Sequence, residues 1–145
     1  MIQLTCPHCQ TTNRVPPERL AEQPSCGACK KPLLAGVHAL HAGTIEGVLQ
    51  QTALPVIIDF WAPWCGPCRS FAPTFAAAAQ KHGGRLIFAK VDTEAEQALG
   101  ARFNIRSIPT LGVFRGGQEL GRISGALPPA QLEALIGEVL KQANV

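Results

Sequence analysis

The feature that most constrains this fold is an apolar run, residues 56–60, that leads within five residues into two closely spaced cysteines, Cys65 and Cys68. A short, nearly continuous apolar run is typical of a strand covered on both faces. After the cysteines, residues 69–82 carry apolar side chains at helical spacing, and Pro73 is expected to kink that helix without ending it. The sequence therefore predicts a buried strand, a turn that carries two thiols, and a helix that begins at this turn.

This setting suits thiol redox chemistry. The free N–H groups and the dipole at the start of a helix favour the thiolate form of Cys65, which is the nucleophilic form. Cys68 follows one helical turn later, close enough to form a disulfide, so that the pair can take up and release two electrons. Asp59 interrupts the apolar run. It is either a solvated carboxylate at the strand end or a buried proton acceptor for the second thiol, with a raised pKa.

Residues 1 to about 34 are rich in turns and lack an apolar period that could form a core, so something other than burial must hold them. They contain two further C-x-x-C pairs, at residues 6–9 and 26–29, and the separation fits a four-cysteine zinc site. A module of fewer than about 40 residues usually needs a metal or disulfides to fold. We predict one tetrahedral Zn²⁺ bound by Cys6, Cys9, Cys26 and Cys29. The alternatives are two redox-active or disulfide-bonded pairs, or a site in which His8 replaces a cysteine.

The rest of the chain alternates strand and helix patterns. The expected elements are a short strand in residues 35–42, a short helix capped by Thr44, a second buried strand in 85–91, a helix in 94–102, a hairpin over 111–124, and a last helix that starts at Pro128 and Pro129. This order implies a largely parallel central sheet with helices on its faces. His38 and His41 have no third ligand nearby, and we expect them to be solvated or edge-strand histidines.

Charge and composition exclude several classes of protein. The formal net charge of +3 is too small to indicate nucleic acid or a membrane surface as a partner. The sequence shows no signal-peptide pattern and no apolar segment of about 18 residues, so we expect a soluble cytoplasmic protein. Six cysteines could form a secreted disulfide framework, but their grouping into three C-x-x-C pairs favours metal and redox roles.

The sequence WCGPC at residues 64–68, in this strand-turn-helix setting, resembles the thioredoxin family, and the resemblance covers residues 36–145. The four-cysteine module in front of it resembles the bacterial zinc-ribbon subgroup of that family. The resemblance implies an α/β thioredoxin fold, a central mixed sheet flanked by helices, over residues 35–145. It also implies a small zinc ribbon over residues 1–34.

The resemblance further implies roles for single residues. Cys65 corresponds to the attacking nucleophile and Cys68 to the resolving cysteine, whereas Asp59 corresponds to the buried carboxylate that helps to deprotonate the resolving thiol. Lys90 corresponds to the neighbour of that carboxylate, and Pro109 to the cis-proline that faces the sulfurs. The substrate groove is expected at Trp64, Gly66, Pro67, Ile108 and Gly125, with Trp61 and Gly117 near it. Pro63 stands where some members have an acidic residue, which would alter the choice of partner.

The implied activity is the reduction of disulfides in target proteins by dithiol–disulfide exchange, with no bound organic cofactor. The resemblance also implies that thioredoxin reductase, which uses NADPH, restores the dithiol. We expect a monomer that binds neither nucleic acid nor membrane. Gly66-Pro67 resembles the reducing members, and a thiol oxidase or disulfide isomerase on the same fold is the alternative. A second alternative, from a different class of protein, is a zinc-dependent module that binds a partner. The zinc site is either structural or a sensor that loses its metal when its thiols are oxidised.

Overall fold

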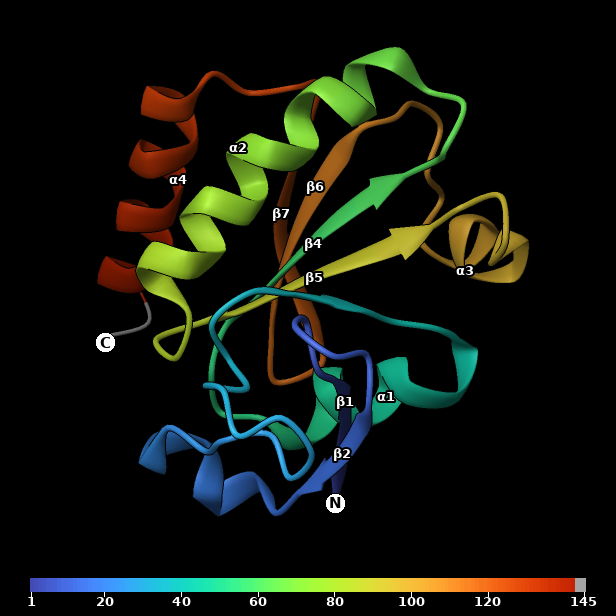
Figure 1. Ribbon diagram of the computed structural model, residues 1–145. Helices are drawn as coiled ribbons and strands as arrows, with labels where there is room; N and C mark the ends of the chain where they lie inside the picture. Colours follow the sequence, from blue (N-terminus) through green and yellow to red (C-terminus); the bar gives the residue numbers. More distant parts are fainter. Residues whose placement is uncertain (143–145) are drawn as a thin grey trace.

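The computed structural model describes residues 1–142, and a five-stranded sheet in the order β3-β5-β4-β6-β7 forms its centre (Figure 1). Strands β3 (Val37–Ala39), β5 (Ile87–Asp92) and β4 (Val56–Trp61) are parallel. Strands β6 (Thr110–Arg115) and β7 (Gln118–Ser124) form a hairpin, and β6 is antiparallel to β4. The sheet is therefore mixed, as the resemblance implied. The expected parallel arrangement fails at β6, which runs antiparallel to both of its neighbours, β4 and β7.

Helices cover both faces of this sheet. Helices α1 (Ala42–Gln51) and α3 (Gln97–Arg102) lie on one face, and α2 (Gly66–His82) and α4 (Pro129–Gln142) lie on the other. Side chains alternate along β4, so that Ile58 and Phe60 pack on the α1 side and Ile57 on the α2 side. By the same alternation the Asp59 side chain lies on the α2 side of the sheet. Pro73 lies inside α2, which continues past it as predicted.

Two helices begin at positions that differ from the prediction. Helix α1 begins after His41, and Thr44 lies in its first turn, where its hydroxyl oxygen accepts a hydrogen bond from the His41 N–H at 3.1 Å. The prediction that Thr44 precedes the helix was wrong because a residue in the first turn can reach back to the cap in this way. Helix α3 begins at Gln97 and not at Glu94, because the Asp92 carboxylate accepts the N–H groups of residues 94 and 95 and holds them in a turn.

The N-terminal module contains strands β1 (Ile2–Thr5) and β2 (Thr12–Val15), paired antiparallel, and a short 3-10 helix, η1 (Pro17–Glu22). The expectation that burial contributes nothing to this module was wrong. Ile2, Leu4 and Leu33 are fully buried in the same apolar core as the residues of α1. The expectation failed because the buried residues of this module join a core that is completed by another element, α1.

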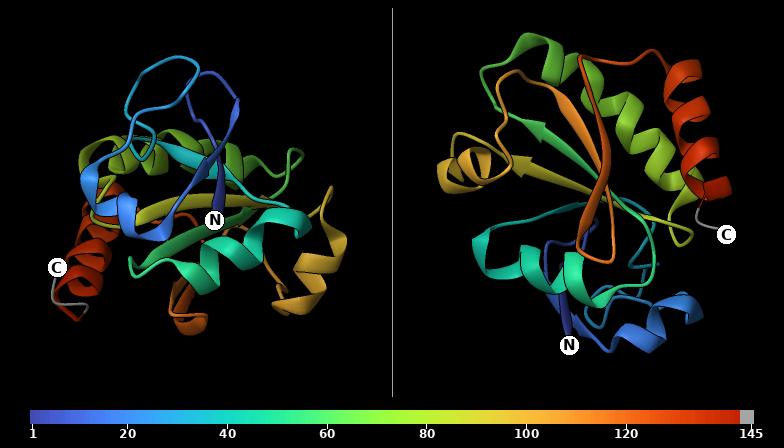
Figure 2. Two further views of the ribbon diagram at one scale, coloured as in Figure 1. Left: turned by 90° about the horizontal axis from the view of Figure 1, so that it is seen from below. Right: turned by 180° about the vertical axis from the view of Figure 1, so that it is seen from behind.

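The zinc-ribbon module lies beside α1 and β3, at the end of the sheet that is remote from the start of α2 (Figures 1 and 2). It covers the edge strand β3, where the His38 ring accepts or donates a hydrogen bond at 2.9 Å between Nδ1 and the Thr5 carbonyl oxygen. His38 is thus an edge-strand histidine, as expected, but it is buried and not solvated, and burial lowers its pKa. No helix within residues 1–142 is both long enough and apolar enough to cross a bilayer.

Candidate functional site

The two cysteines of the WCGPC sequence lie in the segment that runs from the end of β4 through the first turn of α2. Cys65 immediately precedes the helix, and its Sγ accepts a hydrogen bond from the Cys68 backbone N–H at 3.2 Å. Cys65 and Cys68 are joined by a disulfide, with their Cα atoms 5.2 Å apart. Pro67 is in the first turn, where a backbone N–H has no partner within the helix and its loss is harmless. Cys65 is 5% exposed and Cys68 is 1% exposed, so both residues are buried and Cys65 is slightly the more accessible.

A second segment approaches these sulfurs from the other side. The Ile108–Pro109 peptide bond is cis, and the Ile108 carbonyl oxygen lies 3.8 Å from Cys65 Sγ. The Gly125 N–H, at the end of β7, donates a hydrogen bond to the Pro109 carbonyl oxygen at 2.8 Å. The structure therefore brings Ile108, Pro109 and Gly125 together beside Cys65, although they follow it by 43 to 60 residues in the sequence.

A groove of about 200 Å³ runs next to this segment, and it is bounded by the exposed ring of Trp64, which is 66% exposed. Its other lining residues are Thr93, Ile105, Arg106, Ser107 and Ile108. Gly117 does not belong to the site, and its assignment was wrong. Strand β6 starts beside the sulfurs and runs away from them, so that its far end lies against Gln50 of α1.

Asp59 is buried beneath the cysteines, on the α2 side of the sheet. It is 4% exposed, and burial raises the pKa of its carboxyl to about 7, although Lys90, its register partner on β5, acts in the opposite direction. A pocket of about 190 Å³ is lined by Asp59, Trp61, Cys68, Arg69, Ala72 and Lys90. Within residues 1–142, neither Asp59 Oδ1 nor Trp61 Nε1 has a hydrogen-bond partner. The pocket has room for several water molecules, which can satisfy these atoms and carry a proton between Asp59 and Cys68.

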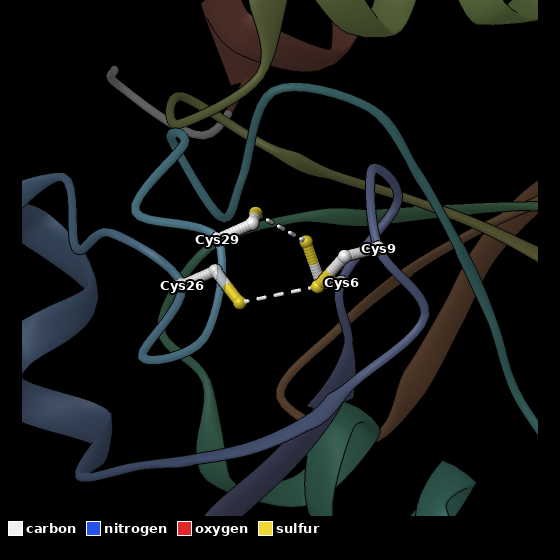
Figure 3. A group of neighbouring side chains, drawn as sticks. All are labelled: Cys6, Cys9, Cys26 and Cys29. Carbon is white, nitrogen blue, oxygen red and sulfur yellow. Dashed lines mark hydrogen bonds between the residues drawn. The ribbon is translucent and has the colours of Figure 1, made fainter.

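The other four cysteines converge from two knuckles of the N-terminal module (Figure 3). The sulfurs of Cys6 and Cys29 lie 3.7 Å apart, those of Cys9 and Cys26 lie 3.6 Å apart, and all four are within 4.8 Å of one another. Sulfurs bound at about 2.3 Å to one tetrahedral zinc ion stand about 3.8 Å apart, so the cluster fits Zn²⁺. His8 contacts the Pro32 carbonyl oxygen with its ring, which removes support for the alternative that it replaces a cysteine.

Hydrogen bonds around the cluster prepare the sulfurs for a metal. Contacts from the Cys29 backbone and from the Asn13 side chain lower the pKa of Cys26 to about 5. A hydrogen bond with the Lys31 backbone lowers the pKa of Cys29, but burial and the neighbouring sulfurs outweigh it and raise this pKa to about 11. Four sulfurs at these distances can all carry a charge only with a cation between them, and a closed set of four sulfur ligands is typical of structural zinc.

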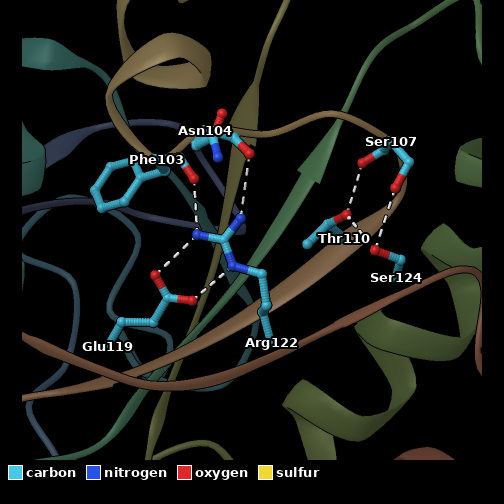
Figure 4. Close-up of polar contacts among 7 residues, drawn as sticks. All are labelled: Phe103, Asn104, Ser107, Thr110, Glu119, Arg122 and Ser124. Atoms are coloured by element: carbon cyan, nitrogen blue, oxygen red, sulfur yellow. Dashed lines mark hydrogen bonds and ion pairs between the residues drawn. The ribbon is translucent and has the colours of Figure 1, made fainter.

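One part of the site was not predicted from the sequence. The side chain of Arg122, on β7, donates hydrogen bonds to the carbonyl oxygens of Phe103 at 2.7 Å and Asn104 at 3.4 Å, and it pairs with Glu119 (Figure 4). Next to this contact, hydrogen bonds of their hydroxyl groups join Ser107 of the loop, Thr110 of β6 and Ser124 of β7. These contacts hold the segment that carries Ile108 and Pro109. No sequence signal marks Arg122, because an arginine in an exposed strand usually only faces solvent.

The fold and the Cys65–Cys68 pair define a thiol–disulfide oxidoreductase. A family model described as Thioredoxin matches residues 36–138, and a second, described as Thioredoxin 2, N-terminal, matches residues 5–31. The chain belongs to the thioredoxin family.

Similar proteins carry the same name. Thioredoxin C-3 of Corynebacterium nephridii is 44% identical over 140 residues, which is 96% of each chain. Thioredoxin 1 of Nostoc sp. is 46% identical over 89 residues, 61% of this chain and 83% of that protein. The crystal structure of Malassezia sympodialis thioredoxin is similar with a TM-score of 0.64 at 31% identity, over 69% of this chain and 87% of that one.

Proposed function

We propose that this protein reduces disulfides of target proteins, through Cys65 as nucleophile and Cys68 as resolving thiol. The observation that carries the proposal is the position of the Cys65 sulfur. Cys65 is slightly more exposed than Cys68, its sulfur accepts the Cys68 N–H at the start of α2, and this sulfur lies 3.8 Å from the carbonyl oxygen of Ile108, a residue that lines the groove. Each of these features favours a thiolate at Cys65 that meets an incoming disulfide.

The reaction proceeds in two exchanges. The Cys65 thiolate attacks one sulfur of the target disulfide, which forms a mixed disulfide and releases the other target sulfur as a thiolate. Cys68 then gives its proton to Asp59, through the pocket that both residues line, and attacks the Cys65 sulfur. The target leaves as a dithiol, and the protein is left with the Cys65–Cys68 disulfide that the structure shows. Lys90 opposes the rise in the pKa of Asp59, which keeps this carboxyl able to release its proton again.

Recognition of the target uses the groove around the sulfurs. An extended target segment pairs with the backbone next to Pro109, as in strand addition, with Trp64 lining the groove and with Gly66, Pro67 and Gly125 beside the sulfurs and Pro109. Support comes from the exposed Trp64 ring and from the approach of Ile108 to Cys65. The partners are disulfide-containing proteins and a thioredoxin reductase that draws on NADPH. We expect a monomer in the cytoplasm that binds neither nucleic acid nor membrane.

Single cysteine variants test the proposed roles. In an insulin reduction assay, Cys65→Ser and Cys68→Ser should each lose at least about 99% of the rate, since each exchange needs its own thiol. Cys68→Ser should also accumulate a covalent complex with the target, and Cys65→Ser should not, because only Cys65 attacks the target. Wild-type rates in both variants would instead support a zinc-dependent module that binds a partner.

The redox potential separates a reductase from an oxidase or isomerase on the same fold. Thioredoxins have a potential near about −270 mV, whereas the periplasmic oxidase lies near about −120 mV. Equilibration of the Cys65–Cys68 couple with glutathione buffers, read by thiol alkylation, should place this protein near the thioredoxin value. A potential close to that of the oxidase would overturn the proposed direction.

We further propose that residues 1–34 form a ribbon whose zinc is structural, and that residues 35–145 form the thioredoxin domain. The burial of Ile2 and Leu4 in the core beside α1 supports this role, because the metal fixes the strands that carry them. A sensing role has its own support, since Cys9 is exposed. Peroxide at a concentration that fully oxidises Cys65 and Cys68 distinguishes the two roles. Retention of zinc fits a structural ion, and its release fits a sensor.

A further inference from the structure

The two hollows that flank the redox cysteines carry an excess of positive charge. Arg106 lines the groove next to Trp64, and Arg69 and Lys90 line the pocket on the opposite side of the disulfide. Among residues 1–142, the only acidic residue that lines either hollow is Asp59, which is buried. A target that approaches Cys65 therefore meets three cationic side chains and no exposed carboxylate in the lining of these hollows.

Both arginines are held in place and keep free donors. Arg69 donates one hydrogen bond, from Nη1 to the Pro63 carbonyl oxygen at 3.1 Å, which fixes its guanidinium across the turn before Cys65. Arg106 donates one, from Nε to the Asn104 side-chain oxygen at 3.3 Å, which fixes it at the rim of the groove. Their remaining donors have no partner in the part of the chain that the structure describes. A guanidinium with free donors on a surface is suited to bind a carboxylate in a bidentate pair.

Within residues 1–142, no ion pair joins Arg69, Lys90 or Arg106 to an acidic side chain. The Asp92 carboxylate, at the end of β5, accepts the N–H groups of Glu94 and Ala95. The Glu96 carboxylate accepts the Ala42 N–H, at the start of α1. Glu94 is exposed, but it lines neither hollow. The positive character of the groove is thus a property of the surface that a target contacts.

We propose that these two hollows select targets with an acidic side chain within about three residues of the disulfide, and that Arg106 binds a carboxylate on the groove side of the disulfide and Arg69 a carboxylate on the other side. The inference rests on the proposed disulfide reductase function. The charges act in two ways: they increase the association rate of acidic targets, and they orient the segment so that its disulfide faces Cys65. Trp64 supplies the apolar contact beside the charged one.

Three disulfide peptides of one sequence test the proposal, with two glutamates, two glutamines or two lysines flanking the cysteine. At low ionic strength kcat/KM for the glutamate peptide should exceed that for the lysine peptide on the order of tenfold, and 0.5 M salt should reduce the ratio to about two, because salt screens exposed charges. Arg106→Gln should lower the ratio of glutamate to glutamine peptide at least threefold. Arg106→Lys should restore part of it, because it keeps the charge but not the fork of donors.

Arg14→Gln is the matched control, since it removes one positive charge from the exposed surface of β2, in the ribbon. It should leave the ratio unchanged. Equal kcat/KM for all three peptides in the wild type would overturn the selectivity and leave the reductase function intact. An equal effect of Arg14→Gln and Arg106→Gln would also overturn it, since net charge alone would then explain the preference. No reduction of any peptide would contradict the proposed function itself.

Discussion

Asp59 is a buried residue whose ionisation lowers the stability of the folded protein. Its carboxyl is buried, one of its oxygens has no hydrogen-bond partner within the described residues, and its pKa is raised to about 7. In the unfolded chain an aspartate has a pKa near 3.8, so between these two values the folded state binds more protons than the unfolded state. Stability therefore falls as the pH rises from about 4 to about 7, and it then levels off.

The Asp59→Asn variant should be more stable than the wild type at pH 8, because its amide cannot ionise. The difference in the free energy of unfolding should grow by on the order of 4 kcal/mol between pH 4 and pH 8, a value set by the shift of about three units. Urea unfolding of the disulfide form at a series of pH values measures it. A difference that does not depend on pH would show that the carboxyl is solvated or paired.

The sequence identified the chemistry of single residues better than their surroundings. Spacing predicts that the two members of each C-x-x-C pair lie together, and the strand-turn-helix setting distinguishes the pair at 65–68 from the four cysteines that are predicted to bind zinc. Whether Asp59 is buried could not be decided, since this depends on how α2 covers the strand. His38 was uncertain for the same reason, because the ribbon that buries it is more than thirty residues away in the sequence.

At the scale of elements, the site depends on the connection between α3 and β6. This connection carries Ile108 and Pro109 but contains no regular structure, and Arg122 of β7 holds its beginning through the carbonyl oxygens of Phe103 and Asn104. These carbonyls lie at the carboxyl end of α3, where a positive charge is also favourable to the helix dipole. A residue of the last strand thus helps to set the position of the groove.

The Arg122→Ala variant should lower the free energy of unfolding by about 1 kcal/mol and lower kcat/KM severalfold, because the groove segment loses its contacts to β7. Urea unfolding and the insulin assay measure the two effects. Arg115→Ala is the matched control, since Arg115 is exposed at the far end of β6 and contacts only the Ala53 carbonyl oxygen. An equal loss of activity in both variants would show that Arg122 has no special role.

Most elements could be predicted from the sequence, because the buried strands and the last helix show clear periods. Their directions in space were harder to predict. Gly117 was assigned to the site from the resemblance, but the six-residue strand β6, which spans about 20 Å, separates it from the sulfurs. The contacts of Arg122 are long-range and depend on the register of β6 with β7, which no local pattern fixes.

At the scale of the whole molecule, the ribbon and the thioredoxin fold share one apolar core. Ile2 and Leu4 pack with Ile45 and Val48 of α1, on the side of the sheet that also holds Phe60. The ribbon is therefore not an appendage on a linker. Damage to its zinc site should be transmitted to the helix and the sheet beneath it.

Removal of zinc should lower the melting temperature of the whole chain by at least about 5 °C, in a single transition, because the strands that carry Ile2 and Leu4 lose their anchor. Calorimetry before and after treatment with a strong chelator measures this, with readdition of zinc as the control. Well below the new melting temperature the reductase activity should stay within about twofold, since the redox pair lies at the other end of the sheet. An unchanged main transition would mean that the two parts unfold separately.

The placement of the six cysteines at opposite ends of the sheet also bears on how the chain is made. Six thiols can pair in 15 ways, and most of these pairings would join a zinc ligand to a redox cysteine. The four ligands precede Cys65 in the sequence, so a nascent chain can close its metal site before the reactive thiol leaves the ribosome. In the finished fold, the module that carries the four N-terminal cysteines lies beside α1 and β3, whereas the redox pair lies at the start of α2. The separation of the two groups of cysteines thus disfavours wrong disulfides between them.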